Sequence, residues 1–344
     1  MSKEAAFSFG SYSASDPNKE VRFVHVLSDY ACFTAAKDGA TWTGLVGRLR
    51  HLIIFVMLLM LALPPVGCGI LGGNNGSNGT TASHDAGGDL NGSIHIAGST
   101  ALLPLAAKAA DLFHQLHHSV QVDVKGGGSV TGLLAVVNHR VDIGDSDIYA
   151  DPVLYPDPNL TDHIICVVAF TLIVDPQVNI SSLSTQQILA IFTRKITNWK
   201  VVGGPDLPIT PVIRPSTSGT RALFRKYVLG GAEESGIPLT SDSSTGLLDV
   251  VAHTRGAIGY VTTTLINPTV RAIGIDGVRA TAQNIKAGRY KFWGYEHMYT
   301  LENGINATTT FLDFMQTAEI QQLAQKLGYI PVSAISDAVE KTHA

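Results

Sequence analysis

The segment RPSTSGT, from Arg214 to Thr220, combines one arginine with small hydroxyl residues and a glycine. Four apolar residues follow at the spacing of one helix face: Leu223, Phe224, Tyr227 and Val228. The hydroxyl residues therefore lie at the N-terminus of a predicted helix, where unpaired N–H groups and a partial positive charge attract anions. The Arg214 side chain adds a planar fork of donors that suits phosphate. Helix capping by Ser218 or Thr220 is the alternative for one isolated motif.

Two further segments repeat the order of strand, small residues and helix. In SIHIAGSTALLPL, which begins at Ser93, alternating isoleucines predict a strand, and GST precedes a run at helical spacing. In SVQVDVKGGGSV, which begins at Ser119, alternating valines predict another strand, and a glycine-rich turn ending at Ser129 precedes a further helix. Three such turns, each with glycine for close approach and a hydroxyl for hydrogen bonding, could converge on one small oxyanion.

The elements that position these turns alternate between strands and helices from Ser93 onward. Strands are predicted at 120–124, 163–174, 207–213 and 257–262, and helices near Leu102, Gly132, Thr185, Gly219 and Ala318. This is an α/β pattern, in which ligands bind at turns that follow strands and precede helices. Two lobes with a cleft between them would let the turns near Ser99 and Ser129 face the turn near Ser218.

Length and composition narrow the class of protein. The chain has 344 residues, of which 45% are hydrophobic, and this is enough for two globular domains. A formal net charge of −4 and the lack of a basic cluster beyond Arg48 and Arg50 argue against nucleic acid as a partner. The sequence has three cysteines, Cys32, Cys68 and Cys166. They are too few and too scattered for a disulfide framework or a zinc site.

The N-terminal quarter has the pattern of a targeting signal followed by a flexible tether. Residues 46–68 have basic residues, then a wholly apolar run, then Gly67 and Cys68, which is typical of a signal peptide whose end resembles a bacterial lipobox. Cys68 is the predicted site of lipidation, although Pro65 stands where that motif usually has leucine. An uncleaved membrane anchor is the alternative.

The segments on either side of the signal peptide carry no predicted function. Residues 1–45 are an N-terminal extension or result from a start assigned too far upstream. Residues 69–92 are rich in Gly, Asn, Ser and Thr, which is the composition of a flexible linker.

Six segments, in this order, carry a resemblance over about residues 93–332: GSTALLPL, GGGSVTGL, VDIGDSDIYAD, ITNW, RPSTSGTR and GAIGYV. They resemble the phosphate-binding substrate-binding proteins of bacterial ABC transporters, the PstS family. The resemblance implies an α/β, two-lobed periplasmic-binding-protein-like fold of type II, with two hinge crossings and a ligand cleft between lobes. Lobe I would comprise 93–170 and 261–344, and lobe II 171–260.

The resemblance also implies a function. The chain would bind inorganic phosphate outside the cytoplasm, as a membrane-attached lipoprotein or in the periplasm, and deliver it to the permease subunits of an ABC transporter. It would be no enzyme and would need no cofactor and no metal. A phosphate sensor that is not coupled to transport would use the same site.

The site residues follow from the matching motifs. The family holds phosphate with donors at three helix starts, one arginine and one aspartate, which in this sequence correspond to Thr100, Ala101, Ser129, Asp147, Arg214, Ser218, Gly219 and Thr220. Ala101 would act through its backbone N–H, since relatives can carry phenylalanine there. Asp147 would accept a hydrogen bond from the hydroxyl group that phosphate carries near neutral pH and that sulfate lacks.

Other readings of these and nearby residues stay open at this point. Asp147 alone would be a turn or capping residue. Asp142 and Asp145 lack the spacing of a calcium loop and are predicted to be structural. The spacing of His114, His117 and His118 would suit zinc, but no cysteine or carboxylate completes a ligand set, so a solvated helix end is favoured.

An enzyme acting on phosphate esters or acyl groups is the remaining class. The sequence has no GxxxxGK loop, no GxSxG elbow and no HExxH, and it places no histidine as a base for Ser129 or Ser218. Trp199 is predicted to pack in the core or at a hinge. The group Trp293, Tyr295 and Tyr299 is predicted to lie in the core, with an interface as the alternative.

Overall fold

The structure is a computed structural model that describes residues 90–237, 239–301, 306–341 and 343. All of them belong to one compact unit of the chain. The predicted extension, signal peptide and lipidation site at Cys68, and all but the last residues of the predicted linker, lie outside the described residues. Within those described, no helix is both long enough and apolar enough to cross a membrane.

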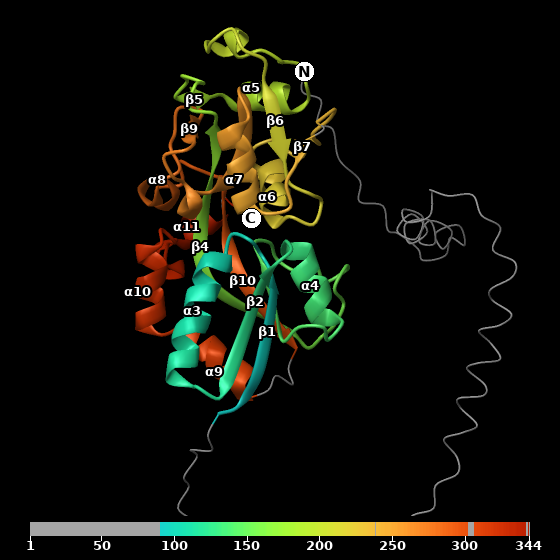
Figure 1. Cartoon of the computed structure of the whole chain (residues 1–344), viewed down its shortest axis with the longest axis vertical. Coiled ribbons are helices and arrows are strands. Elements are labelled where there is room, and N and C mark those ends of the chain that lie inside the picture. Colours follow the sequence, from blue (N-terminus) through green and yellow to red (C-terminus); the bar gives the residue numbers. More distant parts are fainter. Residues whose placement is uncertain (1–89, 238, 302–305, 342, 344) are drawn as a thin grey trace, which may run out of the picture. The chain divides into compact units, whose positions relative to one another are not determined.

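Strands and helices alternate along the described chain, as the sequence predicts (Figure 1). The strands are β1 (Gly92–Gly98), β2 (Val120–Gly126), β3 (Ile143–Ser146), β4 (Leu160–Val174), β5 (Ser182–Leu183), β6 (Thr210–Ile213), β7 (Leu239–Thr240), β8 (Ala257–Thr262), β9 (Arg271–Ile275) and β10 (Trp293–Leu301). The helices are α3 (Leu103–Leu116), α4 (Ser129–Val137), α5 (Thr185–Phe192), α6 (Gly219–Tyr227), α7 (Ser244–His253), α8 (Ala282–Lys286), α9 (Asn306–Met315), α10 (Ala318–Lys326) and α11 (Asp337–Lys341).

Lobe I is built on the strand order β2-β1-β3-β10-β4. The first three of these strands are parallel, and β10 runs antiparallel to both β3 and β4. Successive residues of a strand point to opposite faces. Met298 of β10 packs in the core that contains α3, and Tyr299 packs with Leu133 and Val136 of α4. The two helices therefore cover opposite faces of this part of the sheet.

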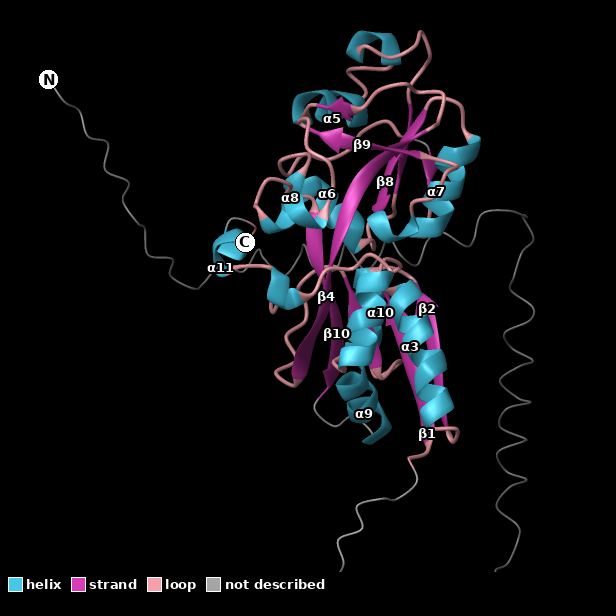
Figure 2. Ribbon diagram, turned by 90° about the vertical axis from the view of Figure 1, so that its left-hand side faces the viewer, coloured by secondary structure: helices cyan, strands magenta, loops and turns pink. Residues whose placement is uncertain are grey.

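Lobe II continues the sheet in the order β4-β8-β6-β7, with β9 paired to β4 and β5 paired to β9. Here β8 is antiparallel to β4, whereas β6 is parallel to both β8 and β7. Val261 lies in the core with α7, and its neighbour Tyr260 stacks on Phe224 of α6, with 4.2 Å between ring centroids. Helices α6 and α7 thus cover opposite faces, and Figure 2 shows α7 beside the strands of this lobe.

The long strand β4 belongs to both lobes, and Figure 2 shows it running from one to the other. Its first part pairs with β10 up to Ala169, and its second part pairs with β8 from Phe170 onward. The chain returns beside this point, because Phe170 N–H donates to the carbonyl of Phe292 over 3.0 Å.

The point at which the chain returns from lobe II to lobe I lies later in the sequence than the predicted boundary. The prediction put the boundary between Tyr260 and Val261, but β9 pairs with Leu172–Val174 of β4 and so belongs to lobe II. We therefore assign the chain to lobe II until about Phe292. Strand β9 has little sequence signal of its own, so only its pairing with β4 reveals the assignment.

Candidate functional site

Two groups of parallel strands present their carboxyl ends to the same region between the lobes. In lobe I, β1 and β2 end in register at Gly98 and Gly126, and β3 ends just before Asp147. In lobe II, β6 and β7 end in register, with Ile213 opposite Thr240, so Arg214 and Ser241 follow at one edge. The turns after these strands therefore face one another across the lobes, where ligands bind in open α/β sheets.

One set of contacts across the lobes centres on Asp147, whose side chain is 3% exposed. Its N–H donates to Ser129 Oγ over 2.9 Å, and its Oδ2 accepts from the hydroxyl of Thr220 over 2.6 Å. A methyl group on Gly219 would lie 2.9 Å from Asp147 Cβ and closer still to Ser129 Oγ. Four residues that the sequence predicted for one site are thus brought together.

A second set of contacts centres on Arg214, which is 1% exposed. Its Nη2 donates to Thr100 Oγ1 over 3.2 Å, and this bond joins lobe II to lobe I. Burial lowers the pKa of the guanidinium, and the charge of Asp147 opposes this shift. Arginine stays protonated in proteins, so Arg214 contributes a full positive charge to the region between the lobes.

A fourth turn, between β7 and α7, completes the surroundings of Arg214 and was missed in the sequence. The Arg214 guanidinium donates from Nε to the carbonyl of Ser241 over 2.9 Å, from Nη2 to that of Asp242 over 3.0 Å, and from Nη1 to Ser244 Oγ over 3.1 Å. Ser244 also contacts Thr100, with 2.8 Å between their hydroxyl oxygens. The segment SDSSTG before a helical run is a signal that could have found it.

Helix N-termini add backbone donors to this region. Gly219 and Thr220 are the first residues of α6, and Ser129 is the first of α4, so their N–H groups have no acceptor within the helix. Ser218 is the N-cap of α6, and its Oγ accepts from Arg221 N–H over 3.3 Å. The capping alternative is therefore true of Ser218, and its hydroxyl hydrogen can still be donated elsewhere.

Ser99 accepts hydrogen bonds within the turn after β1. The N–H of Ala101, which was predicted to face the ligand, donates to Ser99 Oγ over 3.0 Å, as does the N–H of Leu102. Ser99 thus holds this turn, while Thr100 reaches Arg214 and Ser244. We call the set Thr100, Ser129, Asp147, Arg214, Gly219, Thr220 and Ser244 the polar cluster.

Two further carboxyl groups lie buried near Asp147. Burial raises the pKa of Asp145 well above its usual value, and the charge of Asp147 raises it further. Burial likewise raises the pKa of Glu296 in β10, and Asp147 and Asp145 add to this shift. The buried surroundings therefore disfavour the ionised forms of Asp145 and Glu296.

The raised pKa of Glu296 predicts a stability effect that depends on pH. A carboxyl whose pKa is raised by folding favours the folded state below its unfolded pKa, near 4.5, and this contribution is lost as pH rises, because the unfolded chain ionises. Glu296→Gln removes the ionisable group, so the variant does not lose this stability as pH rises. We expect the melting temperature of the variant, relative to the parent, to be higher at pH 8 than at pH 4.5 in thermal unfolding. A difference in melting temperature between variant and parent that does not change with pH would contradict the raised pKa of Glu296.

Other residues singled out in the sequence lie outside the polar cluster. Asp142 Oδ2 accepts from His95 N–H over 2.7 Å, in agreement with a structural role. His114 Nδ1 lies 2.7 Å from the carbonyl of Val120, and no group of three metal-ligating side chains occurs among the described residues. Trp199 is buried in lobe II and donates to the carbonyl of Gly256 over 2.9 Å, which confirms its place in the core.

A cavity of about 460 Å³ adjoins Asp147, but its walls differ in character from the polar cluster. Aromatic side chains dominate them, from Tyr149, Tyr227, Tyr295 and His297. Of the residues predicted for the site, only Asp147 lines this cavity among its described walls. A small oxyanion needs converging N–H and O–H donors, which the polar cluster offers at its helix starts.

Comparisons with known proteins agree on one family. The sequence model of the PBP superfamily domain matches residues 79–319. The Phosphate-binding protein PstS of Bacillus subtilis (strain 168) is 39% identical over 289 residues, which cover 83% of this chain and 95% of that protein. The PstS of Borreliella burgdorferi (strain ATCC 35210 / DSM 4680 / CIP 102532 / B31) is 20% identical over 257 residues, which cover 70% of this chain and 90% of that protein.

Solved structures agree as well. One from Clostridium perfringens, described as a phosphate ABC transporter substrate-binding protein with bound phosphate, is 28% identical and has a TM-score of 0.66, covering 70% of this chain and 100% of the other. An ABC-type phosphate transport receptor from Vibrio cholerae is 25% identical with a TM-score of 0.57, covering 69% of this chain and 99% of the other. The span that the family model matches includes every residue of the polar cluster.

Proposed function

This chain belongs to the PstS family of phosphate-binding proteins of ABC transporters, and we propose that its polar cluster is the place where phosphate binds. The function is the binding of phosphate for an ABC transporter, and the chain is a binding protein, not an enzyme. The finer points that follow are the residues that hold the ion, the closing of the lobes and the anchoring of the chain.

The observation that carries the proposal is the convergence of the four turns on one buried arginine and one buried aspartate. Arg214 supplies the full positive charge, and the starts of α4 and α6 supply N–H donors. Asp147 Oδ1 is buried and has no hydrogen-bond partner among the described residues. It is the acceptor for a protonated phosphate oxygen.

Closing of the lobes follows from where these residues lie. Thr100, Ser129 and Asp147 belong to lobe I, and Arg214, Gly219 and Thr220 belong to lobe II. The chain passes between lobes twice, near Phe170 and near Phe292, and these passages lie side by side. They form the hinge of a type II binding protein, so that the ion is released when the lobes separate.

The direct test is a calorimetric titration of the purified chain from Ser93 onward with phosphate, sulfate, molybdate and arsenate. We expect one phosphate per chain and much weaker binding of sulfate. A chain that is folded by circular dichroism and binds none of these ions would overturn the proposal.

Gly219→Ala tests whether the lobes must approach closely at this point. The added methyl would collide with Ser129 and Asp147 of the opposite lobe, and such overpacking costs about 1 to 3 kcal/mol. We expect phosphate affinity to fall by that amount while each lobe stays folded. Gly230→Ala, just beyond the end of α6, is the control: the positive φ of 62° makes alanine strained there, but its methyl meets nothing within 4 Å and no part of the polar cluster. Equal phosphate affinity in both variants would argue against closure at Gly219.

Anchoring of the chain is proposed from the signal-peptide pattern alone. The mature chain would begin at a lipidated Cys68, with residues 69–92 as a tether that places the lobes near the permease subunits. Cys68→Ala should leave the chain unprocessed or released from membranes in cell fractionation. Mass spectrometry that finds an intact Met1 on the native protein would contradict the proposal.

A further inference from the structure

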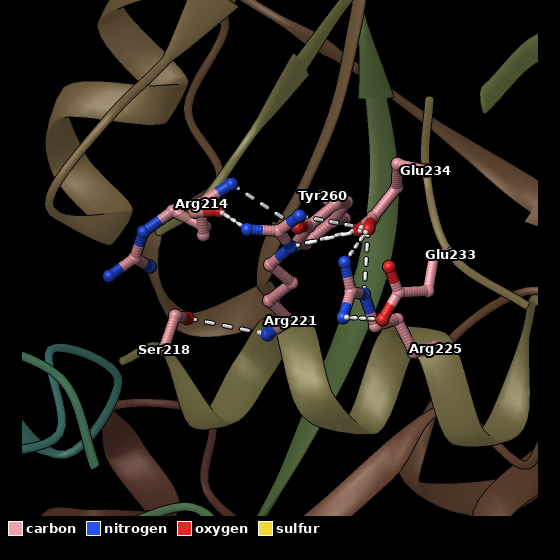
Figure 3. Close-up of polar contacts among 7 residues, drawn as sticks. All are labelled: Arg214, Ser218, Arg221, Arg225, Glu233, Glu234 and Tyr260. Carbon is pink, nitrogen blue, oxygen red and sulfur yellow. Dashed lines mark hydrogen bonds and ion pairs between the residues drawn. The ribbon is translucent and has the colours of Figure 1, made fainter. Parts of the chain in front are cut away.

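The arginine next to the phosphate-binding turn, Arg221, faces away from the polar cluster. Figure 3 shows its guanidinium and that of Arg214 on opposite sides of the Arg214 backbone. Arg221 Nη1 donates to the carbonyl of Arg214 over 2.8 Å, and Nη2 donates to Glu234 over 3.0 Å. Its Nε also donates to Glu234, over 3.1 Å. The charge of Arg221 is thus committed to a carboxylate of its own lobe.

The backbone of Arg214 is held on both of its polar atoms. Its N–H donates to the hydroxyl of Tyr260 over 3.2 Å, and its carbonyl accepts from Arg221. Tyr260 is buried and stacked on Phe224, so it cannot follow a displaced backbone without disturbing the core. On this fixed backbone the side chain of Arg214 reaches its four acceptors.

Glu234 is the group that holds Arg221 in place. Its side chain is completely buried, and it accepts from Arg221 and from Arg225, whose Nε lies 2.7 Å from Glu234 Oε2. Burial raises the pKa of Glu234, but the hydrogen bonds from the two arginines outweigh burial, and the pKa lies below its usual value. The carboxylate is therefore ionised, and it neutralises one of the two guanidinium charges.

We propose that Glu234 and Arg221 are a positioning pair for phosphate binding, which fixes the backbone of Arg214 so that its side chain points into the polar cluster. The proposal rests on the function proposed above and adds two residues that do not touch the ion. A planar guanidinium is needed at position 221, because it must bond to the Arg214 carbonyl and to Glu234 at the same time.

Loss of the carboxylate would act on Arg214 through Arg221. Without Glu234, Arg221 and Arg225 are like charges one helical turn apart, and such neighbours repel. Arg221 would then turn toward solvent and leave the Arg214 carbonyl, and Arg214 would lose part of its preorganisation. Phosphate binding would then have to restore the orientation of Arg214, and this cost weakens the observed affinity.

The test compares Glu234→Gln with Glu233→Gln, by phosphate titration well below the melting temperature of each variant. Glu233 is the matched control, since it is in the same loop, is mostly exposed and pairs with Arg225 rather than with Arg221 among the described residues. We expect Glu234→Gln to weaken phosphate binding about tenfold or more and Glu233→Gln to leave it within about twofold. A lower melting temperature in Glu234→Gln with unchanged phosphate affinity would mean that the pair is only structural and would overturn the proposal.

A double-mutant cycle with Arg214→Ala shows whether the effect passes through Arg214. We expect Glu234→Gln to have little further effect on phosphate affinity in the Arg214→Ala background. The same loss in both backgrounds would overturn the proposal. Should Glu234→Gln fail to fold, Arg221→Lys takes its place in the cycle, because lysine keeps the charge but cannot make both contacts. Failure of the parent chain to bind phosphate would contradict the proposed function itself, whereas a binding parent with unaffected variants contradicts only the positioning role.

Discussion

Replacing Arg214 with alanine should weaken phosphate binding by about 2 to 5 kcal/mol, which is about 30-fold to several thousand-fold. The guanidinium is almost completely buried and supplies the full positive charge of the polar cluster. Its removal also leaves the carbonyls of Ser241 and Asp242 without their donor and breaks the contact with Thr100 in the other lobe. Calorimetry with phosphate on the parent and the variant measures the loss.

The control for this prediction is Arg140→Ala, which removes an exposed arginine after α4 and should leave phosphate affinity unchanged. Arg214→Lys adds a second comparison. Lysine keeps the charge but lacks the planar fork that reaches two carbonyls and two hydroxyls, so it should recover only part of the lost affinity. Parent-like affinity in Arg214→Ala would mean that phosphate binds elsewhere on the chain.

Asp147→Asn should keep appreciable phosphate binding but narrow the ratio of phosphate to sulfate affinity by at least about tenfold, or about 1.4 kcal/mol. A buried carboxylate is a poor partner for a fully ionised oxyanion. Phosphate near neutral pH still carries a proton and can donate it in a hydrogen bond to Asp147, whereas sulfate has none to give. A site built to pair with a ligand hydroxyl rejects an ion without one, because a buried acceptor stays unpaired beside a like charge.

The structure indicates which oxygen of Asp147 makes this distinction. Oδ2 already accepts from Thr220, and Oδ1 has no partner among the described residues. In the asparagine variant the amide oxygen can still accept from Thr220, while the amide group donates to either ion. Tolerance of sulfate should therefore rise without loss of the contact between the lobes.

Competition calorimetry with phosphate and sulfate on Asp147→Asn decides this point. Asp151→Asn is the control, since Asp151 is exposed and its carboxylate accepts from a backbone N–H within its own loop. An unchanged ratio in Asp147→Asn would show that Asp147 is a turn residue and that another group selects against sulfate.

Much of this organisation could be predicted from the sequence because its signals are local. The alternation of valines at 120–124 corresponds to β2, and the apolar run at 163–174 lies within β4. Helices begin at Ser129 and Gly219, where small hydroxyl and glycine residues precede helical spacing. A capping residue and an anion-binding residue have the same local signature, however, so the sequence alone could not separate the two roles of Ser218.

The parts that only the tertiary structure decided depend on contacts between distant segments. Thr100 and Arg214 are 114 residues apart in the chain, and Asp147 and Thr220 are 73 apart, so no local pattern links them. The same holds for the bond from Arg221 to the Arg214 carbonyl, which depends on Glu234 arriving from the loop after α6. By itself the sequence determined which turns can bind an anion, since unpaired N–H groups and hydroxyls are local properties of a helix start. Which charge each turn meets was decided by the packing of the two lobes, because buried charges need partners that only the folded chain brings within hydrogen-bond distance.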